Sequence, residues 1–184
     1  MNIRSTSLSG LLLIEPSVFH DSRGSFAEIW SSSRFTAKGI RDTFVQDNVS
    51  WSAKGVLRGL HFQNPNSQGK FVSVLFGEVF DVGVDLRIDS PTFGKWHGEI
   101  LSAENMRQLY IPPGFAHGFV VLSEQSIFYY KCSAFYAKDS EKTLLWNDPD
   151  IGIIWPVDNP IISEKDRMGR TLKQFSREEL FKFS

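Results

Sequence analysis

The sequence predicts an all-β fold, either a barrel or a double-sheet jelly roll. Short runs that alternate apolar and polar residues dominate the chain, and this period of two is typical of strands with one buried face. Turn residues separate the runs, and many short strands joined by turns favour these two architectures. Aromatic residues make up 14% of the chain, with 16 phenylalanines, which suits strands that line a cavity.

Expected strands follow one another along most of the chain. In order, they are residues 11–15, 26–30, 44–46, 56–58, 71–75, 78–86, 98–101, 108–111, 118–122 and 127–135. The first two flank a turn at residues 21–24, and the polar residues 48–52 separate the third from the fourth. The runs on either side of Gly77 are expected to pair as a hairpin, with Asp81 and Asp85 on one face of the second strand.

Only two helices are expected, and both are short. Residues 31–38 precede Gly39, and glycine commonly ends a helix. Ser176 followed by Glu179 matches a capping box, which predicts the start of a short C-terminal helix. No linker, repeat or low-complexity segment interrupts the 184 residues, so we expect one domain over residues 1–184.

The composition excludes several classes of partner. Lys and Arg number 20 against 21 Asp and Glu, so the overall charge favours neither nucleic acid nor a polyanionic surface. The single Cys132 cannot form an internal disulfide, which favours a reducing compartment. The N-terminus has no apolar signal core, and no apolar run approaches membrane-spanning length. We therefore expect a soluble cytoplasmic protein without a nucleic-acid or membrane partner.

One motif refines the fold to a cupin-like double-sheet jelly roll with a few short helices. Pro112, Gly114 and His117 form the pattern Pro-x-Gly-x-x-His after an alternating run, which resembles the second half of the cupin signature. His61 and Gly77 stand where the first half of that signature would lie.

The metal site of a cupin is not expected in this chain. In a metal cupin the first half reads His-x-His and then an acid, and these residues join the later His around one ion. Here Gln63 replaces the second His, and Lys70 stands in place of the acid. An amide is a poor ligand and an ammonium repels a cation. The sequence therefore predicts a metal-free pocket in which His61 carries a proton.

Three residue types in this pocket suit proton transfer at a carbon next to a ketone. A base such as His61 would remove the proton, and the ammonium of Lys70 would stabilise the enolate oxygen. A phenol would return a proton from the opposite face, and Tyr129, Tyr130 and Tyr136 are the candidates. Imidazole takes up and releases protons near neutral pH, so it suits the role of base.

A buried catalytic histidine needs an orienting partner, and a carboxylate is the usual one. Asp81, Asp85 and Asp166 are the candidates, and the sequence pattern alone does not choose among them. Asp81 and Asp85 are equally consistent with strand acids that pair with a basic residue, and Asp166 lies in a segment that resembles a solvated loop.

Two arginines lie in turn-rich segments beside glycine, where a guanidinium can reach the mouth of a cavity. Arg23 precedes Gly24 and Arg58 precedes Gly59. A guanidinium in such a place suits a diphosphate. No glycine-rich phosphate loop is present, so a nucleotide would be held by side chains. The acid Glu141, taken by itself, fits a solvated loop.

The chain resembles the dTDP-4-dehydrorhamnose 3,5-epimerase family. The matching strings occur in order along nearly the whole chain. They are residues 19–28, 44–48, 56–63, 68–70, 77–82, 85–87, 90–94, 111–119, 130–131, 146–149 and 163–166. The resemblance implies an isomerase that inverts C3 and C5 of dTDP-4-keto-6-deoxy-D-glucose to give dTDP-4-dehydro-L-rhamnose, in dTDP-L-rhamnose biosynthesis.

The resemblance also implies a role for each site residue. His61 is the expected base, oriented by Asp166, with Tyr130 as the acid and Lys70 as the enolate stabiliser. The expected substrate contacts are Arg23, Phe26, Glu28, Gln46, Asn48, Arg58, His117, Tyr136, Glu141 and Lys165, with Tyr136 stacked on the thymine. No cofactor and no metal are expected. Family dimers exchange N-terminal strands, which would bring residues 23–28 to the partner's pocket in a homodimer.

Three alternatives remain open at this point. A C3-only monoepimerase, or an epimerase of a related nucleotide deoxysugar, would carry almost the same residues. A metal cupin is disfavoured by Gln63 and Lys70, and a catalytically silent binding module is disfavoured by the intact set of proton-transfer residues. The sequence departs from relatives at Ser25, Ala27 and Trp51, and these positions could reshape the pocket.

Overall fold

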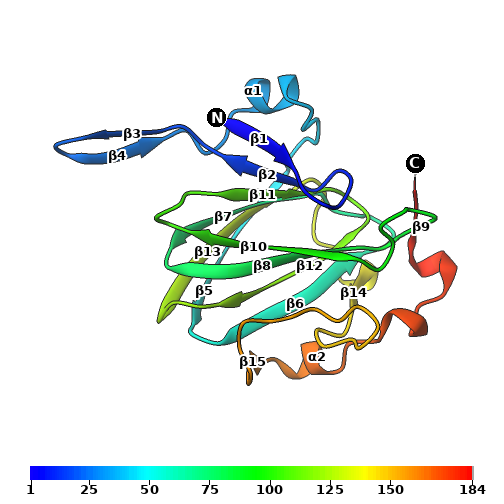
Figure 1. The fold of residues 1–184 in the computed structure, drawn as a ribbon. Helices are drawn as coiled ribbons and strands as arrows, with labels where there is room; N and C mark the ends of the chain where they lie inside the picture. The colour runs from blue at the N-terminus through cyan, green and yellow to red at the C-terminus, as the bar shows by residue number, and fades with distance from the viewer. Residues whose placement is uncertain (184) are drawn as a thin grey trace.

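Two β-sheets packed against each other form the body of the protein in a computed structural model that describes residues 1–183 (Figure 1). The first sheet runs in the order β1 (Asn2–Ser5), β2 (Leu12–Glu15), β11 (Gln108–Ile111), β7 (Lys70–Phe76), β13 (Gln125–Cys132) and β5 (Gln46–Ala53). The second runs β10 (Trp96–Ser102), β8 (Glu78–Asp85), β12 (Phe115–Val121), β6 (Val56–Gln63) and β14 (Glu141–Thr143), and β15 (Ile161–Ile162) pairs in parallel with β6.

The remaining elements are small. A separate hairpin consists of β3 (Val18–Asp21) and β4 (Gly24–Ala27), and β9 (Arg87–Ile88) pairs with β16 (Phe181–Lys182). The helices are α1 (Ser32–Ala37) and α2 (Glu164–Arg167), and single 3-10 turns occur at Lys138–Ser140, Leu172–Gln174 and Arg177–Glu179. None of the helices in residues 1–183 is long and apolar enough to cross a membrane.

The space between the sheets is filled by an apolar core. Val72 and Leu109 of the first sheet meet Val79, Leu101 and Phe115 of the second, and all five are nearly or completely buried. Burial of such side chains is the main favourable term in folding. The cavity described below adjoins this core, since Phe119 and Phe128 belong to both.

The outer face of each sheet is also covered. Phe71 of the first sheet packs beneath Phe35 of α1, with their ring centroids 5.1 Å apart. On the second sheet, Val82 and Val84 are buried by the C-terminal part of the chain, including Phe175. The C-terminal segment thus wraps the outside of the second sheet (Figure 1), which brings α2 next to β6.

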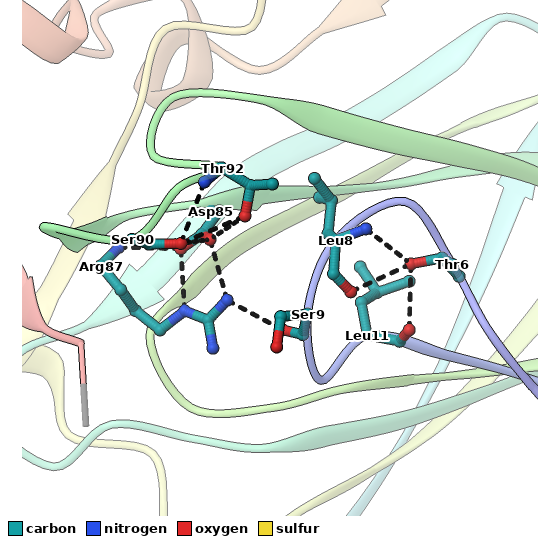
Figure 2. Close-up of polar contacts among 8 residues, drawn as sticks. All are labelled: Thr6, Leu8, Ser9, Leu11, Asp85, Arg87, Ser90 and Thr92. Carbon is teal, nitrogen blue, oxygen red and sulfur yellow. Dashed lines mark hydrogen bonds and ion pairs between the residues drawn. The ribbon is translucent and has the colours of Figure 1, made fainter.

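A buried carboxylate fixes the end of β8 to the N-terminal loop (Figure 2). Asp85 accepts hydrogen bonds from the Arg87 guanidinium at 2.8 Å and from the hydroxyls of Ser90 and Thr92 at 2.7 Å. Arg87 also donates to the carbonyl of Ser9 at 2.8 Å. Burial raises the pKa of Asp85, but these hydrogen bonds outweigh it and hold the pKa below its ordinary value.

The structure confirms the all-β, cupin-like double-sheet prediction and the short helix before Gly39. The predicted hairpin around Gly77 is wrong, because β7 pairs with β11 and β13 whereas β8 pairs with β10 and β12. The chain crosses from one sheet to the other at Gly77, whose φ is +77°. A side chain there would collide with the backbone carbonyl of Gln125.

Three further expectations need correction. Residues 48–52 lie within strand β5 and do not separate two strands, and the polar side chains of Asn48 and Ser50 face the cavities described below. The capping box of Ser176 and Glu179 forms, but it starts a single 3-10 turn and no longer helix. The strand predicted at residues 26–30 ends at Ala27 in β4.

Candidate active site

Two adjoining cavities of about 510 and 270 Å³ lie between the sheets. They share three lining residues, His61, Lys70 and Tyr130, so these side chains stand at the junction of one larger site. His61 comes from β6 of the second sheet, and Lys70 and Tyr130 come from β7 and β13 of the first. The three predicted proton-transfer groups therefore meet in space from three separate strands.

Close packing of β6 against β12 sets the position of His61. A side chain on Gly59 would lie 2.5 Å from the Cα of Gly118, and one on Gly118 would lie 2.7 Å from the carbonyl of Arg58. Both positions therefore require glycine at this close approach. The pairing is irregular between His117 and Phe119, and it leaves His117 directly opposite His61.

His61 and Asp166 form a closely paired dyad, in which only Asp166 is buried. Nε2 of His61 lies 2.7 Å from Oδ1 of Asp166, and the Oδ2 atom accepts the backbone N–H of Gly59 at 3.3 Å. Asp166 reaches this place because Ser163 caps α2, with its hydroxyl accepting the Asp166 N–H at 3.2 Å. The side chain of Asp166 is only 5% exposed, whereas that of His61 is 29% exposed toward the cavity.

The environment of Asp166 favours its charged form. Burial raises the pKa of this carboxyl, but the hydrogen bond and charge of His61 and the backbone N–H of Gly59 outweigh burial and lower the pKa below its ordinary value. An ionised carboxylate on one imidazole nitrogen fixes the tautomer and leaves the other nitrogen free to accept a proton. The arrangement thus makes His61 a suitable base.

Lys70 lies beside His61 and is partly buried in the wall of both cavities. Its Nζ atom donates to the carbonyl of His61 at 3.4 Å. Burial lowers the pKa of Lys70, against the opposing effect of Cys132, Asp81 and Glu141 nearby. An ammonium held in such a site interacts more strongly with a developing oxyanion than one in water.

Tyr130 and Tyr129 point to opposite faces of β13. Tyr130 lines both cavities, and burial raises the pKa of its phenol, with Cys132 and Glu141 adding to the effect of burial. Tyr129 instead donates to Asp47 at 3.0 Å near the surface. Only Tyr130 among these two tyrosines can therefore exchange a proton with a ligand in the cavity.

A second histidine–aspartate pair lies at the larger cavity, with only His117 in its lining. Nε2 of His117 lies 2.8 Å from Oδ2 of Asp81, and both side chains are buried. Burial lowers the pKa of His117, Asp81 opposes this, and the nearby Lys70 and His61 lower the pKa further. The sequence left open which aspartate is the partner of His61. In the structure Asp166 bonds to His61, whereas Asp81 bonds to His117.

The residues at the cupin metal position do not fit a divalent cation. Within residues 1–183 no group of three His, Cys, Asp or Glu side chains is arranged to hold a metal ion. Lys70 points into the space where an acidic ligand would lie, and the amide of Gln63 is already bonded to the backbone of Asn66, Phe135 and Ala137. A cation here would meet an ammonium in place of a carboxylate.

The smaller cavity holds a chain of polar groups at its rim. Tyr136 donates its hydroxyl proton to Glu141 at 2.9 Å, and Lys165 forms an ion pair with the same carboxylate at 2.6 Å. Gln46 donates to Asn48 at 3.0 Å on the adjacent strand β5. These five predicted substrate contacts thus line the combined site, since Lys165 belongs to the wall of the larger cavity.

The four remaining predicted contacts divide into two groups. Arg58 lines the larger cavity and donates to Ser52 at 3.1 Å. Arg23 and Phe26 lie on the β3–β4 hairpin, which projects away from the sheets (Figure 1), and neither lines the central site. Glu28 lies just beyond that hairpin and pairs with Arg34 at 3.2 Å. The structure does not bring these last three residues to the site of their own chain.

Comparison with known proteins identifies the family. The family model described as dTDP-4-dehydrorhamnose 3,5-epimerase matches residues 5–174. A dTDP-4-dehydrorhamnose 3,5-epimerase of Shigella flexneri is 55% identical over 172 residues, which cover 92% of this chain and 95% of that protein. The chain belongs to the dTDP-4-dehydrorhamnose 3,5-epimerase family. It is therefore an enzyme of the isomerase class.

Solved structures of epimerases have the same fold. The dTDP-6-deoxy-D-glucose-3,5-epimerase of Legionella pneumophila Philadelphia 1, in complex with dTDP-4-keto-L-rhamnose, is 49% identical with a TM-score of 0.97, covering 100% of this chain and 98% of that chain. A 3′-monoepimerase of Streptomyces bikiniensis, in complex with dTDP-quinovose, is 35% identical with a TM-score of 0.89, covering 96% and 91%. The epimerase fold thus accompanies more than one pattern of inversion.

Several lining residues of this epimerase-family site were not predicted from the sequence. Ser50 follows Gln46 and Asn48 at the same spacing along β5, and Phe128 and Cys132 flank Tyr130 at a spacing of two along β13. Because alternate residues of a strand share a face, period-two counting from the predicted contacts would have found them. Ile161 and Ile162 of β15 carried no such signal, since they follow an irregular segment.

Proposed function

We propose that the protein inverts C3 and C5 of dTDP-4-keto-6-deoxy-D-glucose and releases dTDP-4-dehydro-L-rhamnose. The observation that carries this proposal is the junction of the two cavities, where His61, Lys70 and Tyr130 surround one space. A base, a cation and a phenol around one ligand suit proton transfer next to a ketone. The family membership of the chain supports the same reaction.

His61 acts as the base that removes the proton from C3 and, in a second round, from C5. Both carbons are next to the C4 ketone, so each proton loss gives an enolate whose negative charge lies mainly on the C4 oxygen. Asp166, ionised and 2.7 Å from Nε2, stabilises the imidazolium that forms. The ammonium of Lys70 stabilises the enolate oxygen, since preorganised cations lower the energy of developing negative charge.

Tyr130 returns a proton to the carbon from the face opposite His61. The two residues belong to strands of different sheets, β13 and β6, so a planar enolate between them would present one face to each. Proton loss on one face and proton return on the other inverts the carbon. The raised pKa of the Tyr130 phenol keeps it protonated and ready to donate near neutral pH.

The remaining lining residues hold the nucleotide portion of the substrate. Arg58 supplies a guanidinium suited to the diphosphate, and Tyr136 supplies a half-exposed ring suited to stacking on the thymine. Further contacts to the nucleotide sugar are assigned to Gln46, Asn48, His117, Glu141 and Lys165, which line the same cavities. None of these roles needs a metal or a cofactor.

Arg23, Phe26 and Glu28 are proposed to act in the pocket of a second copy within a homodimer. The β3–β4 hairpin forms a two-stranded sheet of its own and projects from the body (Figure 1). Phe19 and Phe26 on this hairpin are 65% and 70% exposed, which is unusual for phenylalanine in a monomer. A partner that covers these rings would also bring Arg23 to a second site.

Proton NMR of dTDP-4-keto-6-deoxy-D-glucose incubated with the protein in D₂O tests the reaction. Loss of both the C3 and C5 proton signals, with appearance of the L-sugar, is the expected result. Absence of exchange at both carbons would contradict the proposal. His61→Ala provides the matched control, since it removes the base while the apolar core between the sheets stays intact.

A monoepimerase that acts at C3 alone is the second candidate. It is favoured by one observation, the close likeness in fold to the 3′-monoepimerase of Streptomyces bikiniensis. The same NMR experiment separates the two candidates, because a monoepimerase would exchange the C3 proton and leave the C5 proton in place.

A further inference from the structure

The irregular segment at residues 134–137 is held by the side-chain amides of three glutamines. This segment joins β13 to the 3-10 turn at Lys138–Ser140 and carries Tyr136 at the rim of the smaller cavity. Gln68 donates to the Ala134 carbonyl at 2.8 Å, and Gln63 donates to the Phe135 carbonyl at 3.3 Å. Side-chain amides thus take the place of sheet hydrogen bonds along this segment.

Two N–H groups of the same segment are also bound. The amide oxygen of Gln46 accepts the Tyr136 N–H at 2.9 Å, and that of Gln63 accepts the Ala137 N–H at 2.9 Å. Peptide groups on both sides of Tyr136 are therefore tied to strands β5 and β6. Gln63 alone bonds the segment twice, once on each side of Tyr136.

Gln63 is the central member of this set. It is 4% exposed, and its amide makes a third hydrogen bond to the Asn66 carbonyl at 2.8 Å. The side-chain amide of a glutamine has two N–H donors and a carbonyl acceptor, whereas a neutral imidazole has only one donor and one acceptor. Gln63 lies two residues after His61 on β6, so it links Tyr136 directly to the strand that carries the base.

Tyr136 depends on this backbone support because little else fixes its ring. The residue is 53% exposed, and its hydroxyl donates to Glu141, which itself lies in a short edge strand. A ring exposed to this degree gains little positional order from packing. Its direction is therefore set by where its own peptide groups are held.

We propose that Gln63 is a positioning residue that fixes Tyr136 for contact with the nucleotide of the substrate. This inference rests on the proposed function, because it takes the ligand of Tyr136 to be the dTDP portion of the sugar nucleotide. Gln63 acts through Tyr136 and takes no part in moving protons. The residue that replaces the second metal-binding histidine of a cupin thus serves recognition of the nucleotide.

Binding of dTDP alone, measured by titration calorimetry, tests the inference without any need for turnover. Gln63→Met removes all three amide hydrogen bonds at nearly constant volume. Tyr136 then loses its fixed position, so we expect the Kd for dTDP and the KM for the sugar nucleotide to rise about tenfold or more. The kcat should change less than about threefold, because the proton-transfer groups stay in place. An unchanged Kd and KM, or a fall in kcat alone, would overturn the inference.

A double-mutant cycle separates positioning from a general structural role. If Gln63 acts through Tyr136, adding Gln63→Met to Tyr136→Ala should change the Kd for dTDP by less than about twofold. If the factors by which the two substitutions raise the Kd simply multiply in the double variant, the inference is contradicted. Gln63→Glu keeps an acceptor for the Ala137 N–H but turns a carboxylate oxygen toward the carbonyls of Asn66 and Phe135, so it should raise the Kd at least as much as Gln63→Met.

Gln108→Met is the matched control. Gln108 is 1% exposed and donates to the carbonyl of Ile29 and to the hydroxyl of Ser73, outside the lining of both cavities. The Gln108→Met variant should be less stable than wild type but retain the wild-type Kd for dTDP. If Gln63→Met does not fold, Gln68→Met removes only the bond to Ala134 and should raise the Kd about threefold, and an unchanged Kd in that variant would count against the inference.

Failure of the inference and failure of the proposed function give different results. A wild-type protein that binds dTDP but exchanges neither C3 nor C5 protons would contradict the proposed reaction and leave the Kd comparison valid. A wild-type protein that exchanges both protons, together with a Gln63→Met variant of unchanged Kd and KM, would contradict the positioning role alone.

Discussion

His61 and His117 lie directly opposite each other on the antiparallel strands β6 and β12, and each is bound through Nε2 by its own buried aspartate. The two pairs differ in access to the cavity. His61 is 29% exposed in its side chain, whereas His117 is 7% exposed and burial lowers its pKa. This difference in access supports the proposal that His61 is the base and that His117 contacts the substrate.

Asp166→Asn should lower kcat by about 10²-fold or more, since general base catalysis contributes on that scale and the amide favours the wrong tautomer of His61. The backbone bond from Gly59 can persist, so the fold should be retained. Steady-state kinetics with the sugar nucleotide, alongside thermal unfolding, measures both. Asp148→Asn is the matched control, because Asp148 is equally buried but bonds the backbone of Leu172 and Asp150 away from the site. Equal losses of kcat in the two variants would argue against a specific role for Asp166.

Tyr130→Phe should abolish inversion while leaving exchange with solvent. His61 can still remove the C3 proton and return one to the same face, so deuterium enters from D₂O without a change of configuration. NMR of the recovered sugar measures both outcomes at once. Tyr129→Phe is the control, since this hydroxyl bonds Asp47 on the opposite face of β13. Full epimerisation by Tyr130→Phe would show that another group returns the proton.

Lys70→Met should lower kcat by about 10²–10³-fold, the usual cost of losing an oxyanion donor. The pH dependence gives a second check. Burial lowers the pKa of Lys70, so the ammonium is lost as pH rises through a value below the ordinary 10.5. The wild-type kcat should therefore fall on the alkaline side at a lower pH than an exposed lysine would give. Lys70→Arg, which stays charged, should remove that alkaline fall, and an unaltered profile in Lys70→Arg would assign the fall to another group.

Asp85→Asn should destabilise the fold by about 3 kcal/mol, because it leaves the buried guanidinium of Arg87 without its counter-charge. The folded pKa of Asp85 is lowered, so its contribution is fully present above the unfolded value of 3.8 and is lost as pH falls through the folded pKa. Wild type should therefore lose more thermal stability than Asp85→Asn between neutral pH and about pH 3. Parallel loss in both proteins would mean that other carboxylates dominate. Activity per folded molecule should be unchanged, since Asp85 lies outside the cavities.

The sequence predicted local features such as strands well. It predicted features that depend on contact between distant segments less well. The alternation in β8 correctly placed Asp81 and Asp85 on one face of the strand, opposite Val82 and Val84. The same alternation could not reveal that β7 and β8 belong to different sheets, because pairing partners are chosen by the whole fold. Local pattern predicts a strand, whereas tertiary contacts decide its neighbours.

The same limit explains Asp166. Its own segment is polar and short, and nothing in its spacing indicates burial beside a residue more than a hundred positions earlier. Resemblance to a family supplied its role, and the structure supplies the contact. The polar residues of β5 were misread for a related reason. Polar side chains usually indicate solvent, but here Gln46, Asn48 and Ser50 face an internal cavity.

The placement of the proposed base and the proposed acid on different sheets has a consequence for the evolution of the enzyme. Because His61 and Tyr130 are carried on separate layers, the gap that a sugar ring must bridge is fixed by the thickness of the apolar filling between those layers. Val79 and Leu109, which line neither cavity, would then act as spacers between the proposed base and the proposed acid. Slightly larger or smaller side chains at these positions would change the distance between His61 and Tyr130. That distance would in turn affect which carbon of a sugar can be inverted.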